Sequence, residues 1–152
     1  MYKKLGFLFT ILTIFCFHSN FTLCDVAKNY DGIFYFYTDY MLNDNDCECI
    51  SNGSEYIIFT STKNAKKIQQ KLSTIKGYSF TFNGIKEEMY NVLNRLKCEI
   101  KKREYVDDKL FIYGYSPYFD DFILNNDEKI NIEVCFYKNE INIGVPLILG
   151  SA

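Results

Sequence analysis

The chain contains no tryptophan and one histidine, His18, which lies near the N-terminus. The rest of the chain therefore has no imidazole. It lacks the base of Ser-His-Asp and Cys-His hydrolases, the histidine ligands of zinc and iron sites, and a histidine pH switch. The sequence also contains no internal repeat and no catalytic signature. These absences favour a protein that is not an enzyme, and we predict no cofactor and no metal.

Residues 1–24 have the layout of a secretory signal. Lys3 and Lys4 form a short positive start, and the apolar run over residues 5–17 is too short to span a bilayer comfortably. Cleavage after Cys24 would put small residues, Thr22 and Cys24, at the two positions that a peptidase reads. An uncleaved anchor and a lipoprotein cysteine are the alternatives. We therefore predict a signal peptide over residues 1–24 and a bacterial protein that is secreted or associated with the cell envelope.

The charge balance limits the partners. Two of the 17 lysines and arginines lie in the leader, so residues 25–152 carry 15 basic and 19 acidic side chains, a net charge of about −4. This balance argues against nucleic acid and against an anionic membrane surface as partner. We expect an unknown protein or a cell-wall component instead, with membrane contact only through an uncleaved leader.

Six cysteines are present, at positions 16, 24, 47, 49, 98 and 135. Cleavage after Cys24 would leave four, which allow up to two disulfides in three connectivities. Buried free thiols are the favoured alternative, because Cys98 lies beside the apolar stripe of a predicted helix and Cys135 lies within an apolar strand. A zinc site at Cys47 and Cys49 lacks a second pair of ligands.

Apolar periodicity predicts an α+β fold. We expect strands at 29–42, 78–82, 109–116, 129–138 and 140–148, and a hairpin of residues 47–51 and 54–60 around Asn52-Gly53. A short helix is the alternative at 29–42. Two amphipathic helices are predicted over 61–75 and 85–103, and residues 120–127 form a loop or short strand. Strands with one apolar face indicate a curved, mainly antiparallel sheet with both helices on one face. Residues 25–54 are an aromatic-rich segment with the start of the hairpin, and residues 55–152 are the α+β domain.

Three charged stretches are better explained by local structure than by a functional site. The carboxylates of residues 44–55 fall at calcium-loop positions, but Cys49 stands where the loop needs a glycine, so a solvated acidic loop is preferred. Asp120 and Asp121 are neighbours on an extended segment and would point apart, unlike the paired carboxylates of a glycosidase. The basic run of residues 101–103 is expected to complement the dipole of the second helix.

Tyrosines form the candidate binding surface. Tyr113, Tyr115 and Tyr137 fall on the strand face opposite the aliphatic one and are predicted to share a binding face. Tyrosines exposed on a sheet can bind sugars, peptides or a protein. The alternative is that the first aromatic segment covers them. The wider group considered also includes Tyr35, Tyr37 and Tyr118.

Residues 55–150 resemble the YwmB-like family, in the order of their predicted strands and helices and in motifs of the C-terminal third. The similarity lies in a Tyr-Ser-Pro turn, an asparagine that begins an alternating strand, and a Gly-x-Pro ending. The residues that carry it are Tyr115, Ser116, Pro117, Asn131, Gly144 and Pro146. The resemblance implies an exported protein with a fold like that of the TATA-box-binding protein, and it carries over no catalytic residue.

The resemblance implies no DNA binding either, because Asn131 and Glu133 are expected on the free strand face of an acidic chain. Pro146 cannot donate to a strand ladder, so we expect it at a sheet edge, at a bulge or where the strand stops pairing, and we interpret the last strand as a terminal edge strand. The sequence thus favours a non-catalytic binding or interaction module, with a small carboxylate- or thiol-dependent envelope enzyme as the alternative.

Overall fold

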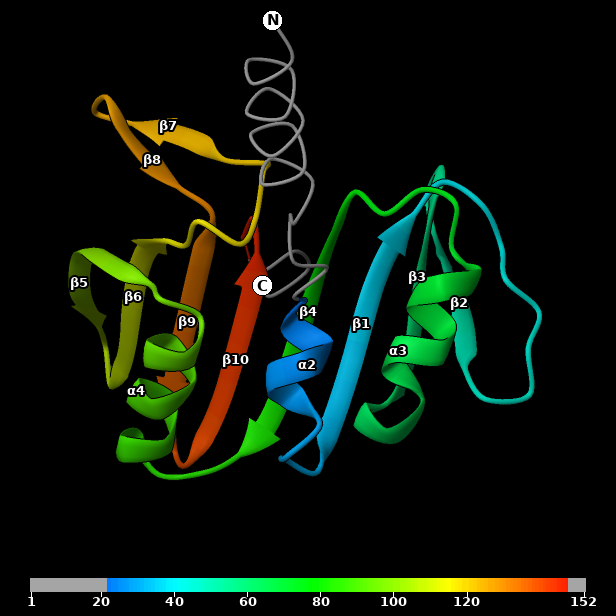
Figure 1. Cartoon of the computed structure of the whole chain (residues 1–152), viewed down its shortest axis with the longest axis horizontal. Coiled ribbons are helices and arrows are strands. Elements are labelled where there is room, and N and C mark those ends of the chain that lie inside the picture. The colour runs from blue at the N-terminus through cyan, green and yellow to red at the C-terminus, as the bar shows by residue number, and fades with distance from the viewer. Residues whose placement is uncertain (1–21, 148–152) are drawn as a thin grey trace, which may run out of the picture.

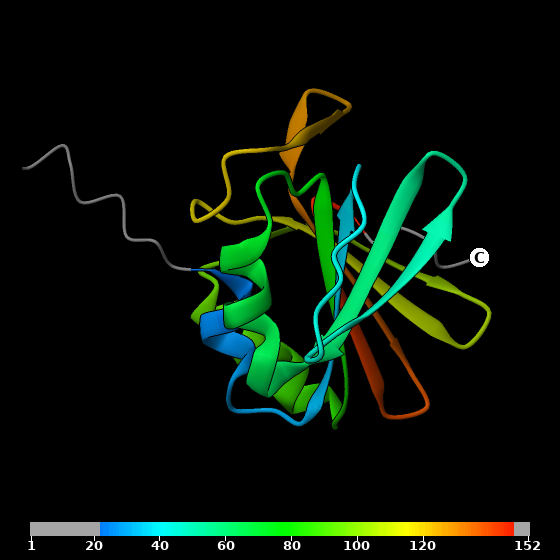
Figure 2. The same cartoon turned by 90° about the vertical axis from the view of Figure 1, so that its right-hand side faces the viewer.

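The computed structural model describes residues 22–147 of the chain (Figure 1). Its main feature is an eight-stranded antiparallel sheet with the order β2-β3-β1-β4-β10-β9-β6-β5. The helices gather on one side of this sheet (Figure 2). The predicted α+β class, with an antiparallel sheet and helices on one face, is therefore confirmed. Within residues 22–147, no helix is both long and apolar enough to span a membrane.

The first part of the chain forms α2 (Leu23–Ala27), β1 (Gly32–Thr38), β2 (Glu48–Asn52), β3 (Glu55–Ser61) and α3 (Thr62–Lys71). The second part forms β4 (Gly77–Asn83), α4 (Lys86–Arg95), β5 (Glu99–Val106), β6 (Lys109–Tyr115), β7 (Ile123–Asn125), β8 (Glu128–Ile130), β9 (Ile132–Tyr137) and β10 (Glu140–Val145). The two parts meet where β1 pairs with β4 in the middle of the sheet. The predicted hairpin is present as β2–β3, with Gly53 at a φ of 65° in its turn.

The predicted helix over 85–103 is wrong in its second half. The helix α4 ends at Arg95, and Lys97 has a φ of 49°, the left-handed conformation that commonly ends a helix. The chain then enters β5, from which Ile100 still packs against the core. Pairing with β6 therefore outweighs the helical periodicity. The basic run 101–103 lies on this strand and does not complement a helix dipole.

Two other boundaries differ from the prediction. The first helix ends at Lys71 and not at 75. The predicted strand over 129–138 is divided at Asn131 into β8 and β9, and β8 pairs with β7. Asn126 and Asp127 make the β7–β8 turn with positive φ angles. This hairpin projects from the body of the molecule at the upper left of Figure 1.

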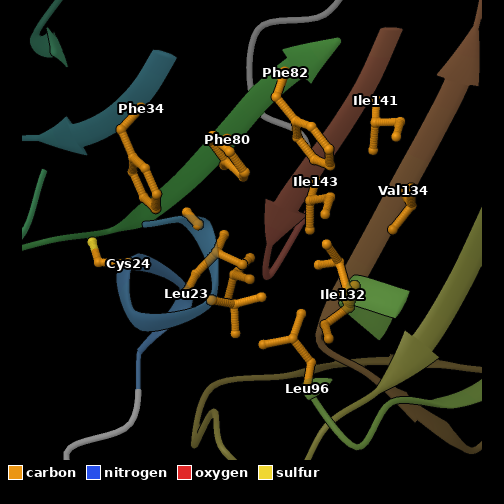
Figure 3. Packing of buried hydrophobic residues seen from close by; sticks show 14 of the residues in the cluster. Leu23, Cys24, Phe34, Phe80, Phe82, Leu96, Ile132, Val134, Ile141 and Ile143 are labelled. Atoms are coloured by element: carbon orange, nitrogen blue, oxygen red, sulfur yellow. The ribbon is translucent and has the colours of Figure 1, made fainter. Parts of the chain in front are cut away.

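The core lies between the sheet and the helices (Figure 3). Phe34 of β1 and Phe80 of β4 stack with ring centroids 5.4 Å apart, and Ile141 and Ile143 of β10 continue the buried layer. Burying each such side chain stabilises the fold by roughly 1.5–3 kcal/mol. Alternation of apolar residues along each strand thus builds a core on one sheet face only.

Helix α2 completes the helix layer. It lies between α3 and α4 over the middle of the sheet (Figure 1). Lys66 of α3 forms an ion pair of 2.6 Å with Asp25, and Arg95 of α4 donates to the carbonyl oxygen of Val26 at 3.3 Å. Residues 1–21 of the predicted leader lie outside the described residues, but the last three residues of the predicted leader, Thr22–Cys24, belong to this packed element.

Candidate binding face of the sheet

The sheet has a second face, which points away from the helices and is called the open face here. Among residues 22–147, no helix packs on it (Figure 2). The strand register places one row of side chains straight across this face, because paired residues on adjacent strands point to the same side. From β3 to β6 this row consists of Phe59, Tyr35, Ser79, Gly144, Glu133 and Tyr113.

One end of the open face is mainly apolar. It is formed by Ile33 and Tyr35 of β1, Ile57 and Phe59 of β3, and Ile50 of β2, and is called the apolar group. Tyr35 and Phe59 are neighbours with ring centroids 6.2 Å apart. Ile33 and Ile50 are 45% and 50% exposed. Large apolar side chains are thus partly exposed to solvent on the sheet face opposite the buried core.

A pocket of about 420 Å³ adjoins the apolar group. Ile33 and Phe59 form part of its wall, and Asp46 and Cys47 of the β1–β2 loop form another part. A hydrogen bond to β3 holds this loop in place, because the Thr60 hydroxyl donates to the carbonyl oxygen of Asp46 at 2.5 Å. The apolar group therefore continues into a concave site.

The other end of the open face carries the predicted tyrosines. Tyr113 and Tyr115 of β6 and Tyr137 of β9 all lie on it together with Phe111, and these four residues are called the tyrosine group. Charged side chains contact their rings: Lys102 lies 5.7 Å from the ring centroid of Tyr113, and Lys138 lies 4.8 Å from that of Tyr137. Such cation–π contacts occupy ring surface that a ligand would otherwise use.

Hydrogen bonding orders the tyrosine group further. The Tyr113 hydroxyl donates to Glu104 at 3.1 Å, and Lys102 pairs with the same carboxylate at 2.5 Å. Burial, and then the bond to Glu104, raise the pKa of Tyr113 above its usual value. The hydrogen bonds from Lys102 and Tyr113 lower the pKa of Glu104. At neutral pH this unit therefore holds a neutral phenol and a charged carboxylate.

Small residues separate the two groups. Ser79 and Thr81 of β4 face Gly144 and Asn142 of β10 in the middle of the sheet. Ser79 is buried, and so is Tyr37, which is hydrogen-bonded to it; burial raises the pKa of Tyr37. The first aromatic segment thus forms the inner strand β1. The alternative expectation, that this segment covers the tyrosine group, is wrong.

The wider tyrosine set divides in the structure. Tyr35 and Tyr37 lie on the open face, whereas Tyr118 lies in the loop after β6, with Lys97 over its ring at 5.5 Å. Sequence reasoning missed Phe59 and Ile33. Strand parity could have found them, because Phe59 alternates with the inward residues Ile58 and Thr60 along β3.

The residues of the Tyr-Ser-Pro turn and Asn131 form a buried unit, and here one expectation is wrong. Asn131 was expected on the free strand face, but it is fully buried. Its side-chain oxygen accepts from the Ser116 amide at 2.7 Å, and its nitrogen donates to the carbonyl oxygens of Ser116 at 2.8 Å and Phe119 at 2.9 Å. Ser116 Oγ donates to the Leu96 carbonyl oxygen at 2.6 Å. Satisfying these backbone groups diverts Asn131 from the strand alternation.

The Gly-x-Pro ending lies at the end of β10. Gly144 pairs with Ser79 on one side and Glu133 on the other, and Pro146 follows Val145, the last residue of the strand. Of the three expected positions for Pro146, the structure shows the one where pairing stops. The interpretation of this segment as an edge strand is wrong, because β10 pairs with β4 on one side and with β9 on the other. Pro117 lies in the turn after Tyr115, where β6 has ended. Of the six resemblance residues, Tyr115 has its ring in the tyrosine group, Ser116 and Asn131 bind backbone groups, and Pro117, Gly144 and Pro146 lie at or near strand ends.

The acidic loop is tied to α3. Lys71 pairs with Asp44 and Lys67 with Asp46, and the amide of Asp46 donates to Asp44 Oδ1 at 3.0 Å. Among residues 22–147, no group of three or more His, Cys, Asp or Glu side chains is placed to hold a metal ion. Lys71 and Lys67 thus balance the charges of Asp44 and Asp46.

Asp120 and Asp121 line a second pocket of about 220 Å³ together with Tyr78, Tyr118 and Pro146. It lies on the opposite side of the sheet from the tyrosine group, because Tyr78 points toward the core and stacks edge-on against Phe119 at 6.2 Å. Burial strongly raises the pKa of Tyr78. The Tyr78 phenol therefore stays protonated at neutral pH and is not an activated nucleophile.

The five cysteines of the described part, Cys24, Cys47, Cys49, Cys98 and Cys135, are free thiols. Burial raises the pKa of Cys24 and of Cys98 to about 12. It also raises the pKa values of Cys47 and Cys135. Thiols with raised pKa values are poor nucleophiles at neutral pH. The favoured expectation of free thiols agrees with this structure.

Comparisons of the chain with protein-family models, with curated proteins and with solved structures give no match. The resemblance to the YwmB-like family and to the TATA-box-binding-protein fold therefore stays a prediction. The function has to be argued from the open face itself.

Proposed function

We propose that this protein is a non-catalytic binding module of the bacterial cell envelope or exterior, and that it binds another protein through the open face. The observation that carries the proposal is the pair of aromatic-rich groups, the apolar group and the tyrosine group, on a sheet face that no described helix covers. Partly exposed Ile, Phe and Tyr residues beside a pocket are typical of the centres of protein interfaces.

The charges on the open face support a protein over the other partners. Glu133 lies in the cross-sheet row, and Glu48 pairs with Phe59 beside the apolar group. Carboxylates at these positions would repel the phosphates of nucleic acid. Lysines cover the rings of Tyr113 and Tyr137, which leaves less ring surface for stacking on sugars. A cell-wall glycan is therefore the second choice.

The alternative of a small carboxylate- or thiol-dependent enzyme has weaker support. Burial raises the pKa values of four described thiols, and the carboxylates of the acidic loop are paired with lysines. The predicted export agrees with the proposed function, because a free binding face on an exported domain would meet partners outside the cytoplasm.

Site-specific photocrosslinking tests the proposal. A photoreactive amino acid replaces Phe59 or Tyr113 in the full chain, and the control position is Tyr105, which is 68% exposed but faces the helix side from edge strand β5. We expect both open-face positions to crosslink one and the same protein on living cells, and Tyr105 not to do so. Tyr35→Ala should reduce the yield about tenfold, as for an interface hot spot.

Equal crosslinking from Tyr105 would contradict the proposed face. Products that disappear after digestion of the wall glycan, and not after proteolysis of the partner, would replace a protein by a glycan as the partner. Crosslinks from neither open-face position would contradict the binding function itself.

A further inference from the structure

Helix α2 is built into the core although it borders on the leader. Leu23 is 0% and Cys24 is 4% exposed, and Val26 and Ala27 are buried as well. Figure 3 shows Leu23 and Cys24 in the same cluster as Phe34, Phe80 and Leu96. These side chains fill the space between α3, α4 and the sheet. Residues that fill a core cannot be removed without leaving a cavity.

Thr22 starts this helix and has bonds of its own. Its amide donates to Asp25 Oδ2 at 2.9 Å, and its hydroxyl donates to the same oxygen at 3.0 Å. The Asp25 amide donates back to the Thr22 carbonyl oxygen at 3.0 Å. Such a reciprocal cap stabilises the first turn of a helix. A chain that began at Asp25 would lose the cap and would keep only three of the five residues of α2.

The position of Cys24 also bears on lipid attachment. A lipoprotein carries its lipid on the sulfur of its first cysteine, so that the sulfur has to lie at the surface. Cys24 instead packs inside the cluster between α2 and the sheet. A diacylglyceryl group there would force α2 out of the core.

We infer that the junction between the leader and the folded domain lies N-terminal to Thr22, so that the processed protein keeps Thr22, Leu23 and Cys24, and that Cys24 carries no lipid. The inference rests on the export in the proposed function as far as processing is concerned. It replaces the cleavage after Cys24 that the small residues at 22 and 24 suggested.

Unfolding experiments test the structural part. Three chains are compared: the full chain, a chain that starts at Thr22, and a chain that starts at Asp25. We expect the first two to unfold within about 3 °C of each other. The chain from Asp25 should melt at least about 10 °C lower or show no cooperative transition, because it lacks a buried leucine, a buried cysteine and a helix cap. Lys28→Ala in the chain from Thr22 is the matched control, since Lys28 is exposed and follows α2; it should leave the melting temperature unchanged.

Equal melting of the chains from Asp25 and Thr22 would overturn the inference. A folded full chain together with an unfolded chain from Thr22 would also overturn it, because the domain would then need part of the leader.

Intact-mass measurement tests the processing part. The full chain is produced in a bacterium with a general secretory pathway, and the chain recovered outside the cytoplasm is weighed. A mass that starts at Thr22 or earlier and carries no lipid is expected. A start at Asp25, or a lipid on Cys24, would overturn the inference. A full-length chain found only in the cytosol would contradict the proposed export, while the unfolding comparison would still decide whether Thr22–Cys24 belong to the domain.

Discussion

The two ends of the open face differ in how their aromatic side chains are held. In the apolar group, Tyr35 and Phe59 rest on each other, and Ile33 and Ile57 surround them. In the tyrosine group, Tyr113 is held by Lys102 and Glu104, and Tyr137 lies under Lys109 and Lys138. Both ends lie on the same sheet and follow the same alternation, so the difference comes from the neighbouring strands.

This difference bears on which of the two groups would contribute more affinity in the proposed binding. Apolar contact does not depend strongly on salt, whereas contacts of exposed charges are screened. The apolar group also adjoins the pocket of about 420 Å³. We therefore expect the apolar group to supply most of the binding affinity and the tyrosine group to supply orientation and specificity.

The largest effect is expected at the turn that follows Tyr115. Asn131→Ala removes three hydrogen bonds of a fully buried side chain, which leaves backbone groups of Ser116 and Phe119 unsatisfied. The free energy of unfolding should fall by about 3 kcal/mol. Chemical denaturation measures it. Asn142→Ala is the control, because the buried Asn142 side-chain oxygen has no hydrogen-bond partner in the described part. A loss as large for Asn142 would contradict the special role of Asn131.

An intermediate effect is expected for the ring contacts. A double-mutant cycle of Tyr35→Ala and Phe59→Ala should give a coupling of about 0.5–1.5 kcal/mol, the range of aromatic pairs. This coupling should not change between about 0.05 M and about 0.5 M salt. The corresponding cycle of Tyr113→Ala and Lys102→Ala should lose coupling over the same range, because the ammonium group is screened. Equal salt dependence of both cycles would remove the distinction between the two ends.

The smallest effect is a pH dependence confined to the tyrosine group. The pKa of Tyr113 in the folded chain lies above its usual value of 10.0, so the phenol ionises first in the unfolded chain. The contribution of Tyr113 to the free energy of unfolding is complete below about pH 10. It is lost as the pH rises toward the pKa of Tyr113 in the folded chain. Tyr113→Phe should reduce the loss of stability between about pH 8 and about pH 10.5, as measured by urea denaturation.

Tyr35→Phe is the matched control for this measurement, because it keeps Tyr113 and should keep the alkaline loss that Tyr113 causes. Tyr78, whose pKa burial also raises, stays in both variants, so their difference isolates Tyr113. An unchanged alkaline loss in Tyr113→Phe would contradict the hydrogen-bonded unit with Glu104.

Much of the candidate face could be predicted from strand periodicity. A strand repeats every two residues, so the inward Leu110 and Ile112 already placed Tyr113 and Tyr115 on the opposite side. The same parity put Tyr137 opposite Val134 and Phe136. The pocket beside Phe59 could not be predicted, because the β1–β2 loop that closes it is positioned by contacts with α3, far along the chain.

Local sequence by itself determined which side of each strand is apolar, where the Asn52-Gly53 hairpin turns and why pairing stops at Pro146. Only the tertiary structure decided the rest. It ended α4 at Arg95, because residues 99–106 pair with β6 along almost their whole length. It buried Asn131, because three backbone groups of a distant turn needed partners. It placed Leu23 and Cys24, which the sequence assigned to the predicted leader, in the buried core, because α2 packs with them against the sheet. Periodicity reports the environment of one segment, whereas these outcomes depend on which segments meet.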